Sequence, residues 1–326
     1  FHLFKVKDVS VNVIPKTSVV PIGKAIGMKL YTDGVLVVGM SEIEGKRPYE
    51  NTGIQEGDRI IQINENDIRN TTELMKEVNN SKGSKINIKY IREEKTISTS
   101  MKPVKSGEEG YKLGLWVRDA AAGVGTLTFY EPDTKMFATL GHGILDVDTL
   151  DLIKIANGEL VTTNILNIQK GERGKPGEIR GTIESGYTLG RITKNTEFGV
   201  YGMLDAPSYL SISNKDAIEV ASREEIKNGP AQIICELENG KKQYFNIEIQ
   251  KIFIGNNEDN KSMLLKVTDE ELLKKTGGIV QGMSGAPIVQ DGKFIVAVTH
   301  VLVNDPSQGY GVFADMMLKQ MRQVKE

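Results

Sequence analysis

A serine set among glycines is the residue of this chain whose surroundings are best suited to chemistry. Ser284 lies in QGMSGAPIV, residues 281–289, directly before the apolar run FIVAVTHV. A serine hydroxyl is a weak nucleophile that needs an adjacent base and donors to stabilise an oxyanion. The nearby glycines allow a tight turn in which the N–H groups of Gly282 and Ser284 converge on one developing charge. A tight turn without a catalytic role is the alternative, and the spacing alone leaves both open.

The candidate base is one of only three histidines in the chain. His142 lies in FATLGHGI, where an apolar run ends in a glycine-flanked turn, so it is well placed to act as general base for Ser284. The alternative for His142 is a capping or packing role. His300 lies inside the strand-like run FIVAVTHV and is expected to be a wall residue, and His2 has no comparable surroundings.

Composition excludes several classes of protein. The chain has 326 residues, 39% of them hydrophobic, and a net charge of -2, which fits a globular protein without the basic surface that binds nucleic acid. A single cysteine, Cys235, excludes an internal disulfide framework and a cysteine-based zinc site. No cluster with metal-ligand spacing is present, so we expect neither a metal nor a cofactor. No apolar run reaches the roughly 18–20 residues that span a bilayer. The chain begins at Phe1, which leaves open a removed signal or membrane anchor.

Strand and turn patterns predict a mainly β protein of two domains. Residues 1–17 are expected to form a lead-in strand, 18–103 a compact unit of strands and one helix, 104–110 a polar linker, and 111–326 an antiparallel β domain. MKLYTDGVLVVGM is expected to give two strands joined by a turn at Asp33 and Gly34. Helices are expected at TTELMKEV, capped by Thr71 or Thr72, at TDEELLKKTGG, capped by Thr268, and at ADMMLKQMRQV.

The first unit resembles a PDZ domain in AIGMKL (25–30), TGIQEGDRIIQINENDI (52–68) and TTELMKEV (71–78). In such domains a peptide adds a strand opposite a helix, and backbone N–H groups of a glycine loop hold a terminal carboxylate. The resemblance implies that peptides, by their C-termini or internal segments, are partners of this unit. It places the peptide site at Ile26, Gly27, Met28, Leu30, Leu74 and Val78. The alternative is that these residues are the core of a small β domain.

The rest of the chain resembles a chymotrypsin-like peptidase, through GTLTFYEPDTKMFATLGHGI and the later GMSGAPIVQDGKFIVAVTHV. Together with the PDZ unit, TGGIVQGMSGAPI and AVTHVLVNDPSQGYGV, the chain is similar to the stage IV sporulation protein B serine peptidases. The resemblance implies a PDZ domain followed by a chymotrypsin-like antiparallel double β-barrel. It also implies a self-cleaving serine endopeptidase exported to the forespore intermembrane space, which cuts a membrane-anchored regulator of an intramembrane protease that matures a sigma factor.

The resemblance also assigns roles to residues. Ser284 is the nucleophile, His142 the base, and Asp269, fifteen residues before the serine, the third member of the triad. Asp269 equally fits the first turn of a helix as a cap, and Glu197 and Asp205 are reserves for the third role. By analogy with the chymotrypsin hairpin, the specificity pocket takes Gly278 at its base, His300 and Val301 on its wall, and Thr299 as support for the triad carboxylate. The absence of an acid there argues against a demand for Lys or Arg.

Two further interpretations stay open at this point. One is a non-catalytic PDZ-containing adaptor that has kept a peptidase-like fold, although an idle fold has no need for both Ser284 and His142. The other concerns the basic glycine-rich segment KGERGKPGEIRG, residues 170–181, which is expected to be exposed and is a candidate for self-cleavage.

Overall fold

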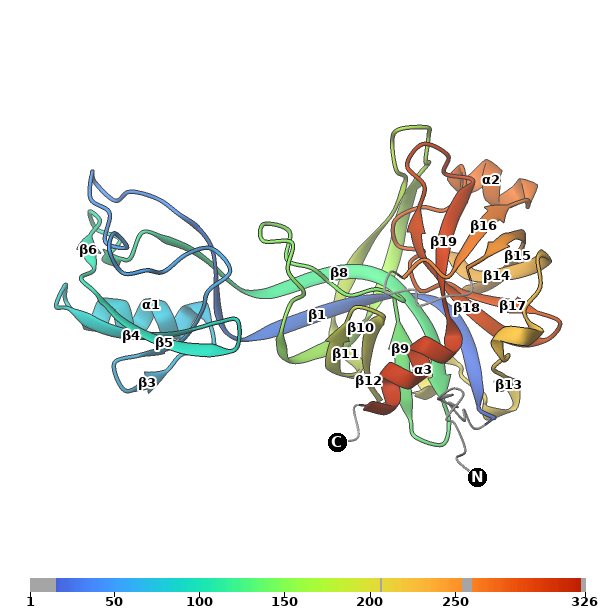
Figure 1. Ribbon diagram of the computed structural model, residues 1–326, viewed down its shortest axis with the longest axis horizontal. Coiled ribbons are helices and arrows are strands. Elements are labelled where there is room, and N and C mark those ends of the chain that lie inside the picture. The colour runs from blue at the N-terminus through green and yellow to red at the C-terminus, as the bar shows by residue number, and fades with distance from the viewer. Residues whose placement is uncertain (1–15, 206, 254–259, 324–326) are drawn as a thin grey trace, which may run out of the picture.

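A small domain and a larger double barrel are joined by two long paired strands (Figure 1). The computed structural model describes residues 16–205, 207–253 and 260–323. The strand expected at residues 1–17 lies outside this range except for its last two residues. The mainly β fold, with a small α/β domain followed by a barrel domain, is confirmed. The elements are β1 (Ser18–Met40), β2 (Arg59–Ile63), β3 (Asn66–Asp67), α1 (Thr71–Asn80), β4 (Ile86–Arg92), β5 (Lys95–Met101), β6 (Val104–Lys105), β7 (Tyr111–Lys112), β8 (Leu115–Glu131), β9 (Met136–Thr139), β10 (Ile155–Gln169), β11 (Glu178–Thr196), β12 (Gly199–Leu204), β13 (Ile218–Glu219), β14 (Gly229–Glu238), β15 (Lys241–Ile252), β16 (Met263–Val267), α2 (Glu270–Thr276), β17 (Pro287–Gln290), β18 (Lys293–Val301), β19 (Gln308–Phe313) and α3 (Ala314–Arg322), with short 3-10 helices at Pro207–Leu210, Asn214–Asp216 and Arg223–Glu225.

The first barrel is a ring of strands in the order β1-β8-β9-β12-β11-β10, closed by the pairing of β10 with β1. Its core contains Ile26, Met28 and Leu30 of β1, packed with residues such as Leu127 and Leu160. Because successive side chains of a strand point to opposite faces, a ring of strands encloses one set of apolar residues without leaving a sheet edge.

The second barrel closes in the order β14-β15-β16-β19-β18-β17. The C-terminal helix α3 packs at the contact between the barrels, where Met317, Leu318 and Met321 lie in one cluster with Val19 and Phe129 of the first barrel. Burial of these side chains holds the barrels together, since each fully buried Met, Leu or Phe contributes about 1.5–3 kcal/mol of transfer free energy.

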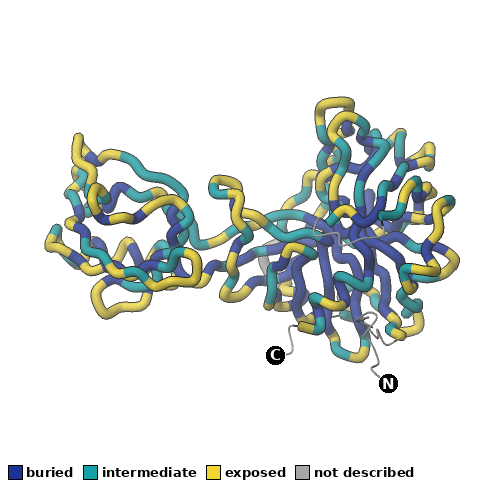
Figure 2. Tube along the Cα trace, in the orientation of Figure 1, coloured by how far each residue is buried: buried dark blue, intermediate teal, exposed yellow. Residues whose placement is uncertain are grey.

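The small domain has its own core, in which α1 covers a sheet ordered β8-β1-β2-β4-β5. Figure 2 shows this interior and that of the barrels as separate buried regions, joined by a less buried pair of strands. Helix α1 is capped by Asn70, whose side chain accepts a hydrogen bond from Glu73 N–H at 2.9 Å. The caps expected at Thr71 or Thr72 are wrong by one or two residues, because Thr71 is already in the helix and bonds elsewhere.

The small domain is inserted between the first two strands of the first barrel. Residues 20–31 of β1 pair with β8, and from Ile26 onward also with β10, in the barrel, whereas Leu36 to Met40 pair with the start of β8 in the small domain. By strand pairing, the part of β1 before the bend contributes to the barrel, so the expected bounds of the small domain, 18–103, stay a prediction. The segment 104–110, expected to be a linker, contains β6 and the turn before β7, and these two short strands pair with each other.

The expected turn at Asp33 and Gly34 is also corrected, because β1 continues through this point with an irregular register rather than reversing. Gly34 takes a left-handed φ of 101°, and the Thr32 hydroxyl donates to the Gly34 carbonyl at 2.6 Å. An extra stretch of strand bends the chain here, as a β-bulge does. Among the helices in the described ranges, none has the length and apolar character needed to cross a membrane.

The position of Gly27 in the barrel can be tested directly. A Cβ at Gly27 would lie 2.9 Å from side-chain atoms of both Ile183 and Val161, whereas one at Gly123, on the adjacent strand, would meet nothing within 4 Å. We expect Gly27→Val to lower the free energy of unfolding by about 1–3 kcal/mol through overpacking, and Gly123→Val to leave it nearly unchanged. Denaturant titration measures both. If the two variants are equally stable and Gly27→Val loses peptide binding, the expectation that Gly27 belongs to the peptide site would be supported instead.

Candidate functional site

A cleft of about 530 Å³ opens between the two barrels, and both Ser284 and His142 line it. Its walls come from the chain segments that approach one another there: Ala121 to Val124 of β8, Leu140 to Leu145 after β9, Ile279 to Gly282, and Thr299 to Val301 of β18, with Met28. The structure thus brings the two principal sequence-predicted residues to one cavity, although they lie on different barrels and far apart in the chain.

Residues 281–287, here called the serine loop, are held by Thr126 of β8. The Thr126 hydroxyl donates to the Gly282 carbonyl at 2.7 Å, and the Thr126 N–H donates to the Ser284 carbonyl at 3.1 Å. Gly285 has a φ of 92°, and a Cβ there would lie 2.5 Å from backbone atoms of Leu140 and Thr126. Only glycine fits this contact, so the serine loop lies directly against the segment that leads to His142.

Two backbone donors of the serine loop are unused within the described ranges. The N–H of Met283 donates to Val280 and that of Gly285 to Val298, but no acceptor among the described residues takes the N–H of Gly282 or of Ser284. Neither residue is fully exposed. Two free donors flanking a serine hydroxyl are the arrangement that stabilises an oxyanion.

The imidazole of His142 has one defined hydrogen bond, between Nδ1 and the Gly143 carbonyl at 2.8 Å. Because a carbonyl only accepts, Nδ1 carries the proton in the neutral ring and Nε2 is free to accept one. Burial lowers the pKa of His142, and the bond to Gly143 offsets this only in part. The ring is therefore neutral at pH 7, as a general base must be.

The Ser284 hydroxyl donates to the Thr299 carbonyl at 3.0 Å rather than to His142. The transfer of its proton to His142 therefore requires rotation of the Ser284 side chain. Catalytic hydrogen bonds often form only in the complex with substrate, so this geometry is compatible with a nucleophile at rest.

His300 is stacked beside His142, with ring centroids 5.4 Å apart. Burial, then the neighbouring His142 and Lys261, lower the pKa of His300 to about 4. Two imidazoles at this distance disfavour each other's protonation, which adds to the preference of the pair for the neutral state at pH 7.

The structure separates the four residues expected in the specificity pocket. Thr299, His300 and Val301 line the cleft. Gly278 does not, and a Cβ there would meet the Pro306 carbonyl at 2.0 Å. The Thr299 hydroxyl donates to the Asn260 carbonyl at 2.7 Å and supports no carboxylate.

Asp269 lies at the N-terminus of α2 and is not brought to His142. Its carboxylate accepts hydrogen bonds from the N–H groups of Glu271, Leu272 and Asn246, at 3.0–3.2 Å. It is the N-cap of the helix, which corrects the cap expected at Thr268. The reserve residues do not take the third role here either, since Glu197 is exposed and Asp205 is ion-paired with Arg191.

The small domain has a separate groove of about 290 Å³ between α1 and the start of β8. Leu74, Met75 and Val78 of the helix line one side, and residues 111–117 line the other. Along Leu115 to Val117, β8 pairs with β1 on one edge, and no strand among the described residues pairs with its other edge. An unpaired edge beside a helix is the geometry that accepts an added peptide strand.

The structure brings two of the six residues expected at the peptide site to this groove and places the other four elsewhere. Leu74 and Val78 lie at the groove, but Ile26, Gly27, Met28 and Leu30 belong to the first barrel. Their strand is paired on both edges, with β8 and with β10, so it offers no edge to a peptide. The segment Leu113-Gly114-Leu115 has the same apolar-Gly-apolar pattern as Ile26-Gly27-Met28, and this pattern is the sequence feature that could have located the groove.

The basic segment 170–181 is exposed at residues 172–175 but anchored around them. The N–H of Gly171 donates to Thr276, that of Gly174 to Val303, and the Gly177 carbonyl accepts from Gln281, all at 2.8 Å. A segment fastened beside the serine loop at three points has to release these bonds before it can enter the cleft.

Comparison with known proteins agrees with this architecture. The sequence model of the family SpoIVB peptidase S55 matches residues 109–318. The chain belongs to the SpoIVB peptidase S55 family. A PDZ domain matches residues 22–102, a range that starts within the barrel part of β1 and stops before the groove-lining part of β8. The chain is therefore a serine peptidase of the S55 family with a PDZ domain.

No curated protein matches the chain. Among solved structures, the chain is similar to the PDZ domain of an SdrC-like protein from Listeria monocytogenes, with 21% identity, a TM-score of 0.23, and coverage of 26% of this chain and 87% of that one. It is also similar to the inactive form of the Rv3671c protease of M. tuberculosis, with 12% identity, a TM-score of 0.36, and coverage of 62% and 85%.

The role of Asp269 can be tested by two substitutions. Asparagine can keep the cap bonds to Glu271 and Leu272 but loses the acceptor of the Asn246 N–H, so Asp269→Asn should cost less stability than Asp269→Ala, which loses all three bonds and should cost about 1 kcal/mol or more. We expect Asp269→Asn to keep its reaction with a fluorophosphonate probe, because the carboxylate does not contact His142. Loss of labelling by several orders of magnitude in a stable Asp269→Asn protein would show that it acts on the histidine.

Proposed function

We propose that Ser284 is the nucleophile of a serine endopeptidase and His142 its general base, with the N–H groups of Gly282 and Ser284 as the oxyanion hole. The observation that carries this proposal is that the hydroxyl, a neutral imidazole and two unused backbone donors meet in one cleft between the barrels. In the first step Nε2 of His142 accepts the hydroxyl proton while Oγ attacks the peptide carbonyl carbon. The same imidazole then returns the proton to the leaving amine.

For the orientation of His142 we propose the Gly143 carbonyl in place of a carboxylate. It fixes the tautomer, which is one of the two tasks of the aspartate in a triad, but it supplies no negative charge to stabilise the imidazolium. A modest rate, suited to a peptidase that cuts itself and few other targets, is the expected consequence.

For the substrate we propose the chain itself and a membrane-anchored regulator of an intramembrane protease in a spore-forming bacterium, with the chain acting in the forespore intermembrane space. The support for this is membership of the family, and the exposed residues 172–175 are a candidate site of self-cleavage. For the PDZ domain we propose that it holds a peptide along Leu115 to Val117, with an apolar side chain against Leu74 and Val78.

Fluorophosphonate labelling of the purified chain tests the catalytic proposal. We expect the native protein to be labelled at Ser284, Ser284→Ala not at all, and His142→Ala about a thousand-fold more slowly or worse. Because burial lowers the pKa of His142, the labelling rate of the native chain should fall only at pH values below the 6.5 of a free imidazole. A folded native protein without any labelling would favour the non-catalytic adaptor, an alternative that gains support from the bond between Ser284 and the Thr299 carbonyl.

The groove can be tested with the intrinsic fluorescence of Trp116, the only tryptophan of the chain, which lines it and is 63% exposed. We expect a hexapeptide that ends in valine with a free carboxylate to change this fluorescence, and Met75→Arg to weaken its binding about ten-fold or more. Met75 is 60% exposed in the groove, and Met203 of β12, which is 39% exposed and lies outside the groove, provides the control Met203→Arg. Unchanged affinity in Met75→Arg would exclude the groove as the peptide site.

A further inference from the structure

We propose that Arg118 is a positioning residue for His142 and that, with its neighbour Asp119, it connects the peptide groove to the interbarrel cleft. The inference rests on the proposed roles of His142 and of the groove. Both residues lie on β8, between the groove-lining part of that strand (Leu115–Val117) and the cleft-lining part (Ala121–Val124).

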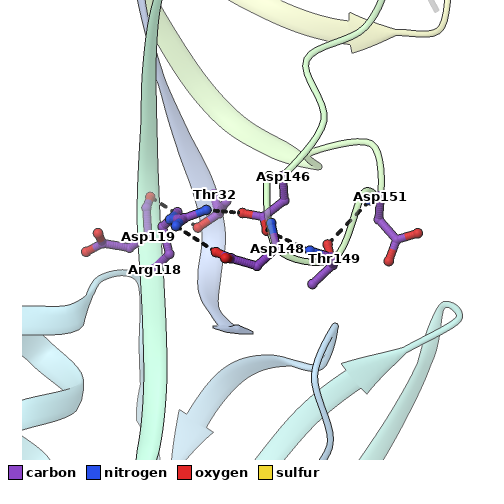
Figure 3. A network of polar contacts seen from close by, with 7 residues as sticks. All are labelled: Thr32, Arg118, Asp119, Asp146, Asp148, Thr149 and Asp151. Carbon is purple, nitrogen blue, oxygen red and sulfur yellow. Dashed lines mark hydrogen bonds and ion pairs between the residues drawn. The ribbon is translucent and has the colours of Figure 1, made fainter. Parts of the chain in front are cut away.

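Arg118 forms hydrogen-bonded ion pairs with the segment that follows His142 (Figure 3). Its guanidinium donates to Asp146 at 2.7 Å and to Asp148 at 2.8 Å. The second oxygen of Asp146 accepts from the N–H groups of Asp148 and Thr149, so this carboxylate also closes the turn at the tip of the segment. One arginine therefore holds the folded tip of the loop at residues 142–154, here called the histidine loop.

The histidine loop has few other attachments. At its neck, the Asn195 side chain bonds both N–H and carbonyl of Ile144, and its amide also donates to the Ile153 carbonyl. Beyond that neck lie the exposed side chains of Val147 and Leu150 and an exposed ion pair of Lys154 with Glu94. Exposed ion pairs contribute little, so Arg118 is the principal restraint on the tip.

Loss of this restraint would be costly because the Asp146 carboxylate is buried: only 2% of its side chain is exposed. Burial raises its pKa, but the two N–H donors and Arg118 together outweigh burial and hold the pKa below its usual value. A buried carboxylate that loses its cation must either protonate or move into water. The two N–H donors disfavour protonation of Asp146, so loss of Arg118 favours movement of the loop into water.

Asp119 ties the same point of β8 to the helix of the groove. One of its carboxylate oxygens accepts from both the N–H (2.6 Å) and the hydroxyl (2.9 Å) of Thr71, in the first turn of α1. Its carbonyl, at 3.1 Å, shares the proton of the Thr32 hydroxyl with the nearer Gly34 carbonyl, at the bend of β1. Adjacent residues of a strand point to opposite faces, so Arg118 and Asp119 reach the histidine loop and the groove helix from one peptide unit.

A peptide paired along Leu115 to Val117 would order the strand directly before Arg118. We expect it to lower the mobility of the histidine loop and so to raise the reactivity of Ser284, by about five-fold or more. If the effect of the peptide depends on Arg118, it should disappear when Arg118 is replaced. A general gain in stability on ligand binding would persist without Arg118.

Four proteins test the proposal: the native chain, Arg118→Met, Asp146→Asn and the double variant. Asparagine keeps the oxygen that closes the turn but needs no cation, so the double variant should hold the loop without Arg118. Arg191→Met is the matched control, because Arg191 makes an exposed ion pair with Asp205 elsewhere on the first barrel. Arg118→Lys, which keeps the charge but not the two-armed geometry, should be intermediate.

Two readouts separate positioning from loss of fold. The first is the rate of fluorophosphonate labelling with and without the valine-terminated hexapeptide, with Trp116 fluorescence to confirm that the peptide binds. We expect Arg118→Met to label about ten- to a hundred-fold more slowly and to lose the response to peptide, and the double variant to recover at least half of the rate. Arg191→Met should behave as the native chain.

The second readout is the ring signal of His142 in NMR, identified with His142→Asn and followed against pH. In Arg118→Met the titration midpoint should rise toward that of a free imidazole, since water would reach the ring; the groups that face it are His300 and, beyond it, Lys261. The NMR readout needs no catalysis. Absence of labelling in the native chain would therefore contradict the proposed function, whereas the NMR titration would still test the role of Arg118. A native titration curve and labelling rate in Arg118→Met, or a double variant no better than the single one, would overturn it.

Discussion

Strand β8 is the constraint on which the other parts of the structure depend. Along its length it borders the groove beside α1, is hydrogen-bonded to the histidine loop and to α1, lines the cleft and contacts the serine loop through Thr126. It then enters the core of the first barrel at Leu127. A strand with this many contacts along its length cannot slide, because a shift of one residue would turn every one of its side chains to the opposite face.

Insertion of the PDZ domain between β1 and β8 explains why the two domains are joined by a stiff connection. A domain appended by one polar linker would sample many orientations. Here both ends of the inserted domain continue into paired strands of the same barrel, so its orientation is set by the β1–β8 ladder. Of the three irregularities in this ladder, the largest lies between Tyr31 and Leu36, where Gly34 takes a left-handed φ, and it is beside Arg118. Any bend of one domain against the other is thus concentrated next to the residues that hold the histidine loop.

Local sequence patterns predicted the parts of the site that depend on local geometry. A glycine-rich turn at Ser284 and a strand end at His142 can be recognised without knowing which strands pair. The mainly β class and the three longer helices follow from periodicity in the same way. The helix caps were missed by one or two residues, because Ser, Thr, Asn and Asp are near-equivalent caps and adjacent candidates compete.

What could not be predicted is set by long-range pairing. Ile26-Gly27-Met28 and Leu113-Gly114-Leu115 carry the same pattern, and only the closure of the barrel by β1 with β10 assigns the first to the core and leaves the second at an open edge. The role of Asp269 is undetermined by sequence for a similar reason. A carboxylate before a helix satisfies the cap whatever lies across the barrel, and its distance from His142 depends on how two separate barrels pack.

The division of the site between two barrels also determines what can vary in it. The serine loop is fixed, because Gly285 lies against the backbone of Leu140 and Thr126 with no room for a side chain. Rotation of the Ser284 hydroxyl from the Thr299 carbonyl toward His142 exchanges one hydrogen bond for another, which costs about 1 kcal/mol at most. The histidine loop, by contrast, leaves its barrel as a long excursion held at its neck by Asn195 and at its tip by Arg118. Under the proposed mechanism the side of the site that carries Ser284 is rigid, so the position of His142 is the part that can vary, and one of the two residues that hold its loop, Arg118, lies on the strand that leads from the PDZ domain.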